Sequence, residues 1–128
     1  MRKLDTDANE QSTFVVIAPF RDEEGAAVTP NSGLTWSLFR LDGTVVNSRT
    51  DMSITPGSSV AIVLSDADLE IFADDPVEEV YVHGIGMMTM QYGIRVVSVS
   101  GTYNSSAGNN LPIKDQVLFR VVNLIGVI

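Results

Sequence analysis

The sequence has no cysteine and only one histidine, His83, among its 128 residues. The absence of cysteine excludes a disulfide framework, but a chain of this length buries roughly 68% of its unfolded surface and does not need one. There is no G-x-S-x-G sequence to present a serine nucleophile next to the single imidazole. The residues therefore predict a protein that is not an enzyme. A hydrolase that uses His83 is the alternative.

Positive charge is also scarce. Eight lysine and arginine residues stand against sixteen aspartate and glutamate residues, which gives a formal net charge of −8 at pH 7. Nucleic-acid binding requires clustered cations, and so does binding to an anionic membrane surface. The charge balance therefore predicts neither of these partners. It is compatible with docking onto a basic protein surface.

Long apolar runs are missing. The longest ones, such as residues 60–64, are far too short to span a bilayer. No apolar stretch follows the basic residues of the opening MRKLDTDANE, so a secretory signal is not expected. Residues 1–12 are polar and show no periodicity, which predicts a flexible N-terminal arm. Such an arm is able to order against a neighbouring subunit.

From residue 13 onward the chain consists of short apolar-alternating segments separated by turn signals. This spacing predicts an all-β antiparallel sandwich of about seven strands over residues 13–124. One short connecting helix is expected over residues 65–72, where acidic residues occupy the first turn. The alternation points these side chains to the core: Leu34, Trp36, Leu38, Val60, Ile62, Leu64, Val117, Phe119 and Val121.

Several turns can be placed from the sequence. Asp42-Gly43 between two strand-like runs predicts a type I′ hairpin with a return strand over residues 45–49. Residues 94–103 are expected to form a long strand, followed by a loop over residues 104–110 (NSSAGNN) and a closing strand. The glycines within residues 84–93 suggest a bulge or a bend.

Two acidic clusters are candidate cation sites. Asp5, Asp7 and Asn9 imitate the start of an EF-hand loop, but Glu10 stands where that loop requires glycine. Residues 74–79 contain a second acidic group. Both patterns are typical of solvated acidic stretches, so no metal ion and no cofactor is predicted.

Two apolar segments are candidates for contact with another subunit. The methionine-rich segment that starts at residue 87 fills irregular core space or forms a contact patch. The apolar C-terminal tail, residues 125–128, completes its own sheet or packs on a neighbour. Both alternatives stay open for each segment. The candidate contact residues are Met87, Met88, Met90, Leu124, Ile125, Val127 and Ile128.

Three stretches carry a family resemblance: residues 30–49 (PNSGLTWSLFRLDGTVVNSR), residues 53–69 (SITPGSSVAIVLSDADL) and residues 99–124 (VSGTYNSSAGNNLPIKDQVLFRVVNL). Together, and in this order, they resemble small immunoglobulin-like proteins of tailed bacteriophages that occur among virion structural proteins. Each stretch is a turn-and-strand pattern, and none is a catalytic signature. Residues 78–93 and the apolar tail depart from the family's pattern.

The resemblance implies an immunoglobulin-like sandwich in a non-enzymatic virion protein, made in the host cytoplasm. It implies an auxiliary capsid protein that decorates or cements the head, with the head–tail junction or the tail as alternative positions. The implied partners are other virion proteins, namely the major capsid protein or copies of the chain itself, and no small-molecule substrate. A carbohydrate- or receptor-binding module is a different class of alternative. Trp36 alternates with core positions, so it is expected in the core and not in a sugar-binding groove.

Overall fold

The part of the chain that the computed structural model describes, the backbone of residues 1–127 and the side chains of residues 1–123, is almost entirely β-structure. Within these residues, nine strands and one 3-10 helix follow one another: β1 (Arg2–Lys3), β2 (Ala8–Asn9), β3 (Thr13–Pro19), β4 (Thr35–Arg40), β5 (Met52–Ser53), β6 (Ser59–Ser65), η1 (Asp66–Leu69), β7 (Val77–Val82), β8 (Gly86–Ser105) and β9 (Gly108–Val127). The described residues include no helix that is long and apolar enough to cross a bilayer.

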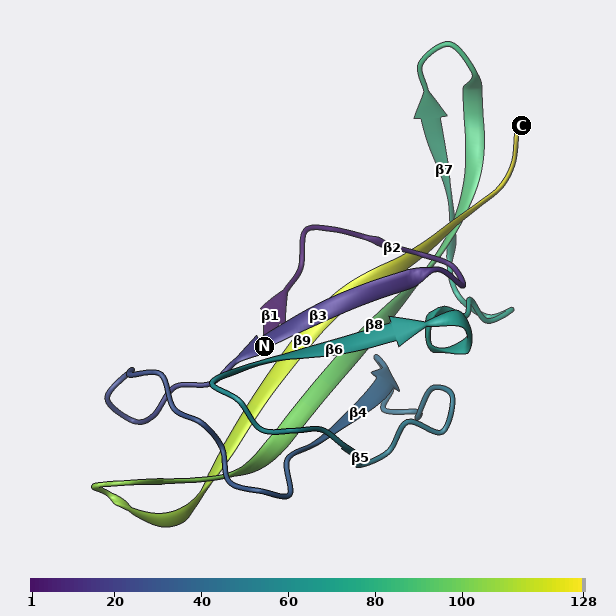
Figure 1. Ribbon diagram of the computed structural model, residues 1–128. Coiled ribbons are helices and arrows are strands. Elements are labelled where there is room, and N and C mark those ends of the chain that lie inside the picture. The colour runs from purple at the N-terminus through teal and green to yellow at the C-terminus, as the bar shows by residue number, and fades with distance from the viewer. Residues whose placement is uncertain (128) are drawn as a thin grey trace.

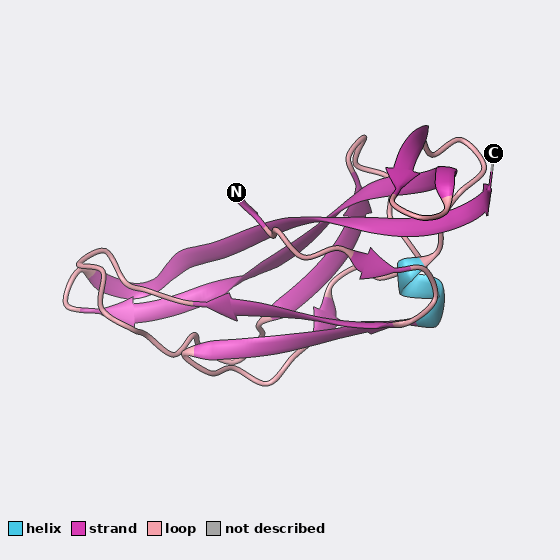
Figure 2. Ribbon diagram, turned by 90° about the horizontal axis from the view of Figure 1, so that it is seen from above, coloured by secondary structure: helices cyan, strands magenta, loops and turns pink. Residues whose placement is uncertain are grey.

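The strands form a sandwich of two unequal sheets (Figure 2). The larger sheet has the order β1-β9-β8-β4-β5, with β2 also paired to β9 and β7 also paired to β8. The smaller sheet consists of β3 and β6, which are antiparallel. The all-β sandwich predicted from the sequence is confirmed. The strands β1, β2 and β5 are each two residues long, so the longer strands make up most of the two sheets.

The core lies between the two sheets and follows the predicted alternation. Every side chain expected to face inward in β4, β6 and β9 is buried. The rings of Phe14 and Phe119 stack across the two sheets with their centroids 5.0 Å apart. Trp36 belongs to the same buried cluster. Burial of these apolar side chains is the main stabilising contribution to a fold without disulfides.

The long hairpin of β8 and β9 runs the length of the molecule (Figure 1). The loop predicted over residues 104–110 is wrong, because Ser105 pairs with Gly108 across a two-residue turn. The polar residues are accommodated at the exposed strand ends by hydrogen bonds of their own. The Asn110 N–H donates to Asn104 Oδ1 at 2.8 Å, and the Asn31 side-chain amide donates to the same oxygen at 3.2 Å.

The turn at Asp42-Gly43 also differs from the prediction. The Gly43 N–H donates to the Arg40 carbonyl at 3.0 Å, and only Gly43 of the two central residues has a positive φ, so the turn is not type I′. The return strand over residues 45–49 is reduced to a single bridge between Phe39 and Val45. Asn47 and Ser48 both have left-handed φ angles, of 52° and 56°, which turns the chain away from the strand direction.

The connecting helix is present but shorter than expected, since it covers Asp66–Leu69 as a single 3-10 turn. The buried Asp68 explains both this turn and the irregular conformation of residues 47–49, which follow β4. Its carboxylate accepts hydrogen bonds from the Asn47 side chain at 2.9 Å, from Arg49 Nε at 2.8 Å and from the Ser65 N–H at 3.2 Å. One buried carboxylate therefore fixes the loop and the helix start together.

The N-terminal segment, expected to be a flexible arm, lies against the larger sheet. β1 and β2 both pair in parallel with β9. Ala8 is only 1% exposed and belongs to the core cluster. Arg120 holds Asp7 through two hydrogen bonds, of 2.8 and 3.2 Å. The polar composition of this segment did not indicate these contacts, because main-chain pairing along β9 does not depend on apolar side chains.

One end of the larger sheet projects beyond the smaller sheet (Figure 1). The predicted bend within residues 84–93 is a hairpin turn between β7 and β8, in which Gly84 and Gly86 have φ angles of 83° and 109°. After this turn β8 continues as an extended strand. The end of β9 pairs with the edge of β8 that faces away from β7.

Candidate interaction surface

We call the projecting end of the larger sheet the tip extension. It consists of β7, the turn at residues 83–85, residues 86–91 of β8 and residues 123–127 of β9. In Figure 1, β7 and the adjoining part of β8 extend past β3 and β6. The smaller sheet therefore does not cover either strand there.

Four apolar side chains of the tip extension are exposed, and we call them the tip surface. Val77 is 55% exposed, Tyr81 67%, Ile85 59% and Met87 36%. Tyr81 and Met87 are direct cross-strand partners, and Val77 lies on the same face further along β7. Ile85 stands in the turn between the strands. Exposed apolar side chains gathered on one projecting element are typical of a protein–protein contact.

The other predicted contact residues, apart from Ile128, belong to β8 and to the end of β9 that pairs with it. Met88 and Met90 alternate to the opposite face of β8 and are half-buried. In the register of β8 and β9, Met88 is opposite Val127 and Met90 is opposite Leu124. Ile125 falls at the register shift between these pairs. The side chains of Leu124, Ile125 and Val127, and all of Ile128, lie outside the described residues.

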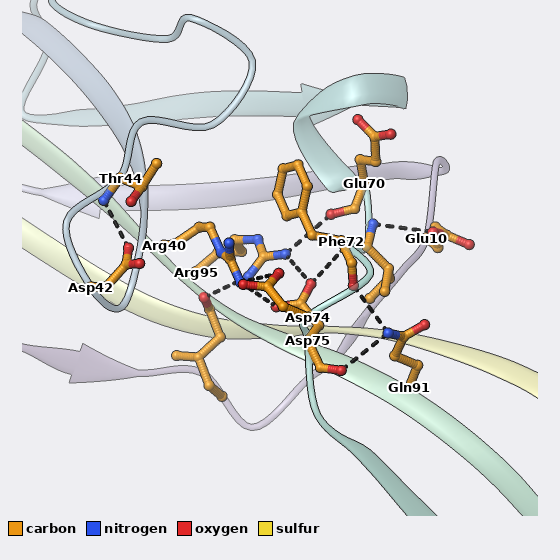
Figure 3. A network of polar contacts seen from close by, with 12 residues as sticks. Glu10, Arg40, Asp42, Thr44, Glu70, Phe72, Asp74, Asp75, Gln91 and Arg95 are labelled. Atoms are coloured by element: carbon orange, nitrogen blue, oxygen red, sulfur yellow. Dashed lines mark hydrogen bonds and ion pairs between the residues drawn. The ribbon is translucent and has the colours of Figure 1, made fainter.

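A buried ion pair holds the base of the tip extension (Figure 3). Arg95 of β8 is 1% exposed, and one of its terminal nitrogens donates to Asp75 Oδ2 at 2.7 Å. The same oxygen accepts the Phe72 N–H at 2.7 Å. Arg95 also donates to the carbonyls of Ile94 and Glu70, at 2.9 and 3.2 Å. These contacts tie the chain before β7 to the middle of β8.

Further contacts close this anchor, which is drawn in Figure 3. The centroid of the Phe72 ring lies 4.9 Å from the guanidinium carbon of Arg40 and 5.2 Å from that of Arg95. The Gln91 side-chain amide donates to the carbonyls of Phe72 and Asp75, at 3.0 and 3.1 Å. Arg40 reaches Asp75 Oδ1 at 3.2 Å. This hydrogen-bond network restrains the orientation of β7 where the strand begins, so we expect the tip extension to be ordered relative to the rest of the sheet.

The electrostatics of the anchor favour the charged form of Asp75. Burial by itself raises the pKa of this carboxyl, but the hydrogen bonds from Arg95 and from the Phe72 N–H outweigh it and hold the pKa below its ordinary value. The same balance holds at Asp68, where burial raises the pKa but the hydrogen bonds from Arg49 and Asn47 lower it by a larger amount. Both carboxylates are therefore structural anions.

Several of the acidic groups considered as cation sites are engaged in ion pairs. Asp7 binds Arg120, Asp74 binds Arg40, and Glu78 lies 3.7 Å from Arg120. Among the described residues, no three histidine, cysteine or acidic side chains are grouped so that they could hold a metal ion.

His83 and Trp36, the residues considered for catalysis and for sugar binding, lie in different parts of the fold. His83 is exposed in the turn between β7 and β8. Trp36 is buried in the core, so its ring is not available to stack on a sugar.

An open hollow of about 320 Å³ lies where the N-terminal segment meets β7, β8 and β9. Arg120 lines it, stacks over the Tyr92 ring at 5.5 Å, and is paired with Asp7. Because the guanidinium is already bonded to a carboxylate, it is a poor anchor for an anionic ligand.

Sequence reasoning missed Arg95 and Asp75. The available signal was an arginine inside the apolar run IRVV, since a charge in a strand with a core face requires a buried partner. The partner is not deducible from the sequence, because it lies twenty residues earlier in an irregular segment.

Comparison of the chain with protein-family models, with curated proteins and with solved structures finds no match in any of the three.

Proposed function

We propose that this chain is a non-enzymatic structural protein of a bacteriophage virion, an auxiliary capsid protein that binds its neighbours through the tip surface. The alternative position within a particle is the head–tail junction or the tail. The observation that carries the contact mode is the exposure of Val77, Tyr81, Ile85 and Met87 on an anchored projection. The virion itself is proposed from the family resemblance of residues 30–49, 53–69 and 99–124.

The composition of the tip surface supports a protein partner. Tyrosine and methionine are enriched in the buried centres of protein interfaces, where they supply large contact areas. Glu79 stands between Val77 and Tyr81 on the same face of β7, and Glu78 lies on the opposite face, so acidic groups accompany the apolar side chains. A partner with an apolar pocket surrounded by basic residues would complement this arrangement.

The anchor supports the same proposal on energetic grounds. A surface that is already ordered loses little conformational entropy on binding, which leaves more of the contact energy as affinity. Weak contacts of this kind become effective together when many copies sit on a symmetric shell.

The test is binding to assembled particles of the phage that encodes the chain. The double variant Tyr81→Ser with Met87→Ser removes apolar contact area and leaves the core unchanged. It should reduce co-sedimentation with purified heads by about tenfold or more. Its thermal unfolding should stay close to that of the unmodified chain, because both side chains are exposed.

The matched control is Val15→Ser with Ile17→Ser, which removes similarly exposed apolar side chains from the smaller sheet. It should bind heads normally. Equal loss of binding in both double variants would contradict the role of the tip surface. Absence of the unmodified protein from intact particles, and failure to bind them, would overturn the virion function.

Copy number separates the positions within the particle. A shell component should be present in many copies, at a fixed ratio to the major coat subunit. A junction or tail protein should be present only in the small number of copies that forms a ring. Quantitative mass spectrometry of intact particles measures this ratio.

A further inference from the structure

The second edge of β6 carries main-chain groups with no partner strand among the described residues. In the antiparallel pairing of β3 and β6, residues that exchange hydrogen bonds alternate with residues that do not. The Phe20 N–H donates to the Ser58 carbonyl at 2.9 Å, and the Asp66 N–H donates to the Ser12 carbonyl at 3.1 Å. The even-numbered residues of β6 therefore bond to β3, and Ala61 and Val63 point their main-chain groups away from it.

The other strand of the smaller sheet has a protected edge. In β3, Pro19 removes one donor at the end of the strand, and the Arg2 guanidinium donates to the Ile17 carbonyl at 2.9 Å. β7, also at a sheet edge, carries the charged Glu78 and Glu79. Charges, proline and covering side chains are the devices that prevent sheet edges from pairing with other chains.

β6 has none of these devices. Its seven residues, SVAIVLS, contain no charge, no proline and no glycine. Val63 is 58% exposed on the outer face. An uncharged, β-branched edge strand of this length is a ready template for another strand.

We propose that β6 pairs with β6 of a second copy of this chain, antiparallel, about a two-fold axis at Ile62. In this register Ala61 lies opposite Val63 of the partner subunit. Each of the two residues then donates its N–H to the other's carbonyl, and the two-fold axis repeats the exchange. The Ser65 N–H already donates to Asp68, so the free edge ends there.

Two features of the chain favour a second copy over a foreign strand. Read in opposite directions, SVAIVLS places serine opposite serine, Val60 opposite Leu64, and Ile62 opposite itself. Such self-complementarity is what a two-fold interface requires. The chain also has a net charge of −8, so two copies repel each other. This repulsion is weakest when the contact is made by a segment without charge, and β6 is such a strand. The product is a continuous four-stranded sheet, β3-β6-β6-β3.

The first experiment measures the oligomeric state of the full chain by sedimentation velocity over a concentration series. The unmodified chain should form dimers, more strongly at high salt, because salt screens the repulsion between acidic copies. Ala61→Pro removes an N–H that points away from β3, so the fold should persist while the dimer Kd rises about tenfold or more. Val15→Pro changes the matched position on the edge of β3 and should leave the dimer intact.

The second experiment fixes the register, and the chain suits it because it has no cysteine. Chains with Ala61→Cys are mixed with chains with Val63→Cys and oxidised. Directly opposed residues lie about 5.5 Å apart between Cα atoms, within disulfide range, so the mixture should form a cross-linked heterodimer. Ala61→Cys alone should not cross-link, since identical positions are diagonal neighbours roughly 7–8 Å apart.

A chain that stays monomeric at all concentrations overturns the proposal. This holds even if Ala61→Pro weakens binding to another protein, because that result would mean that a strand of the other protein occupies the edge of β6. A dimer that ignores Ala61→Pro overturns it as well. If Ala61→Pro fails to fold, the mixed cysteine experiment decides. Cross-linking between 61 and 63 supports the register, and its absence in a dimeric sample contradicts it.

Discussion

The guanidinium group of Arg95 occupies the space against Gly93, where a Cβ atom would lie 2.5 Å from both terminal nitrogens. The two residues are on the same face of β8, so only a residue without a side chain at position 93 lets Arg95 fold back along the strand toward Asp75. The buried ion pair at the base of the tip extension therefore depends on a glycine that takes no part in it.

Gly93→Ala should destabilise the fold by about 1–3 kcal/mol, because the added methyl group displaces the guanidinium from its buried position. The urea midpoint of unfolding measures the effect. Gly101→Ala is the control: its Cβ would meet the flexible end of Leu34 at 2.9 Å, so the cost should be smaller. Equal costs at the two positions would contradict the special role of Gly93.

Asp75→Ala should destabilise the fold by about 3–5 kcal/mol, since it leaves the Arg95 charge buried without its counter-ion. The neighbouring Asp74→Ala is a matched control. Its side chain is 73% exposed, against 4% for Asp75, and its pairing with Arg40 should contribute about 1 kcal/mol or less. Hydrogen exchange in β7 should accelerate in Asp75→Ala and stay unchanged in Asp74→Ala. Similar stability losses in both variants would show that burial of the pair is unimportant.

Acid should destabilise the protein in a defined direction. The pKa values of Asp68 and Asp75 lie below the ordinary 3.8 in the folded state, so below that pH the unfolded chain binds more protons than the folded one. Their contribution is complete above the unfolded pKa and is lost as pH falls through the lower folded pKa. Urea midpoints measured from pH 6 down to pH 2.5 should drop below about pH 4.

Asp68→Asn should reduce that drop, because one of the two groups no longer titrates. The variant should be less stable than the unmodified chain at pH 6, and the difference should narrow in acid. A difference that stays constant over the whole range would contradict the assignment.

Ala8→Asp should destabilise the fold by about 2 kcal/mol or more, because it places a carboxylate in the core cluster without a hydrogen-bond partner. Asn9→Asp, at the exposed neighbouring position, should change stability by less than about 0.5 kcal/mol. Thermal unfolding of the two variants measures this contrast. A tolerated Ala8→Asp would mean that the N-terminal segment does not pack against β9 in solution.

The alternation of apolar side chains was sufficient to predict the core of β4, β6 and β9. Phe119 and Ile62 follow directly from period-two spacing, because one face of each strand must be buried. The strand ends were harder to predict. Residues 104–110 have loop composition, but hydrogen bonds between Asn104 and Asn110 keep the backbone paired almost to the turn. The predicted return strand ends at Asn47 and Ser48 because Asn47 and Arg49 bind Asp68, a contact that no local pattern reveals.

The period-two alternation and the excess of acidic residues were enough to predict an all-β sandwich with a net negative charge, because neither property depends on how the strands are arranged. Three features became visible only in the folded chain: Tyr81 and Met87 share one exposed face, Arg95 meets Asp75, and β6 has no partner strand on its second edge within the described part of the chain. These features depend on which strands become neighbours and in what register. Both are set by the packing of the whole chain, over separations that no periodicity spans.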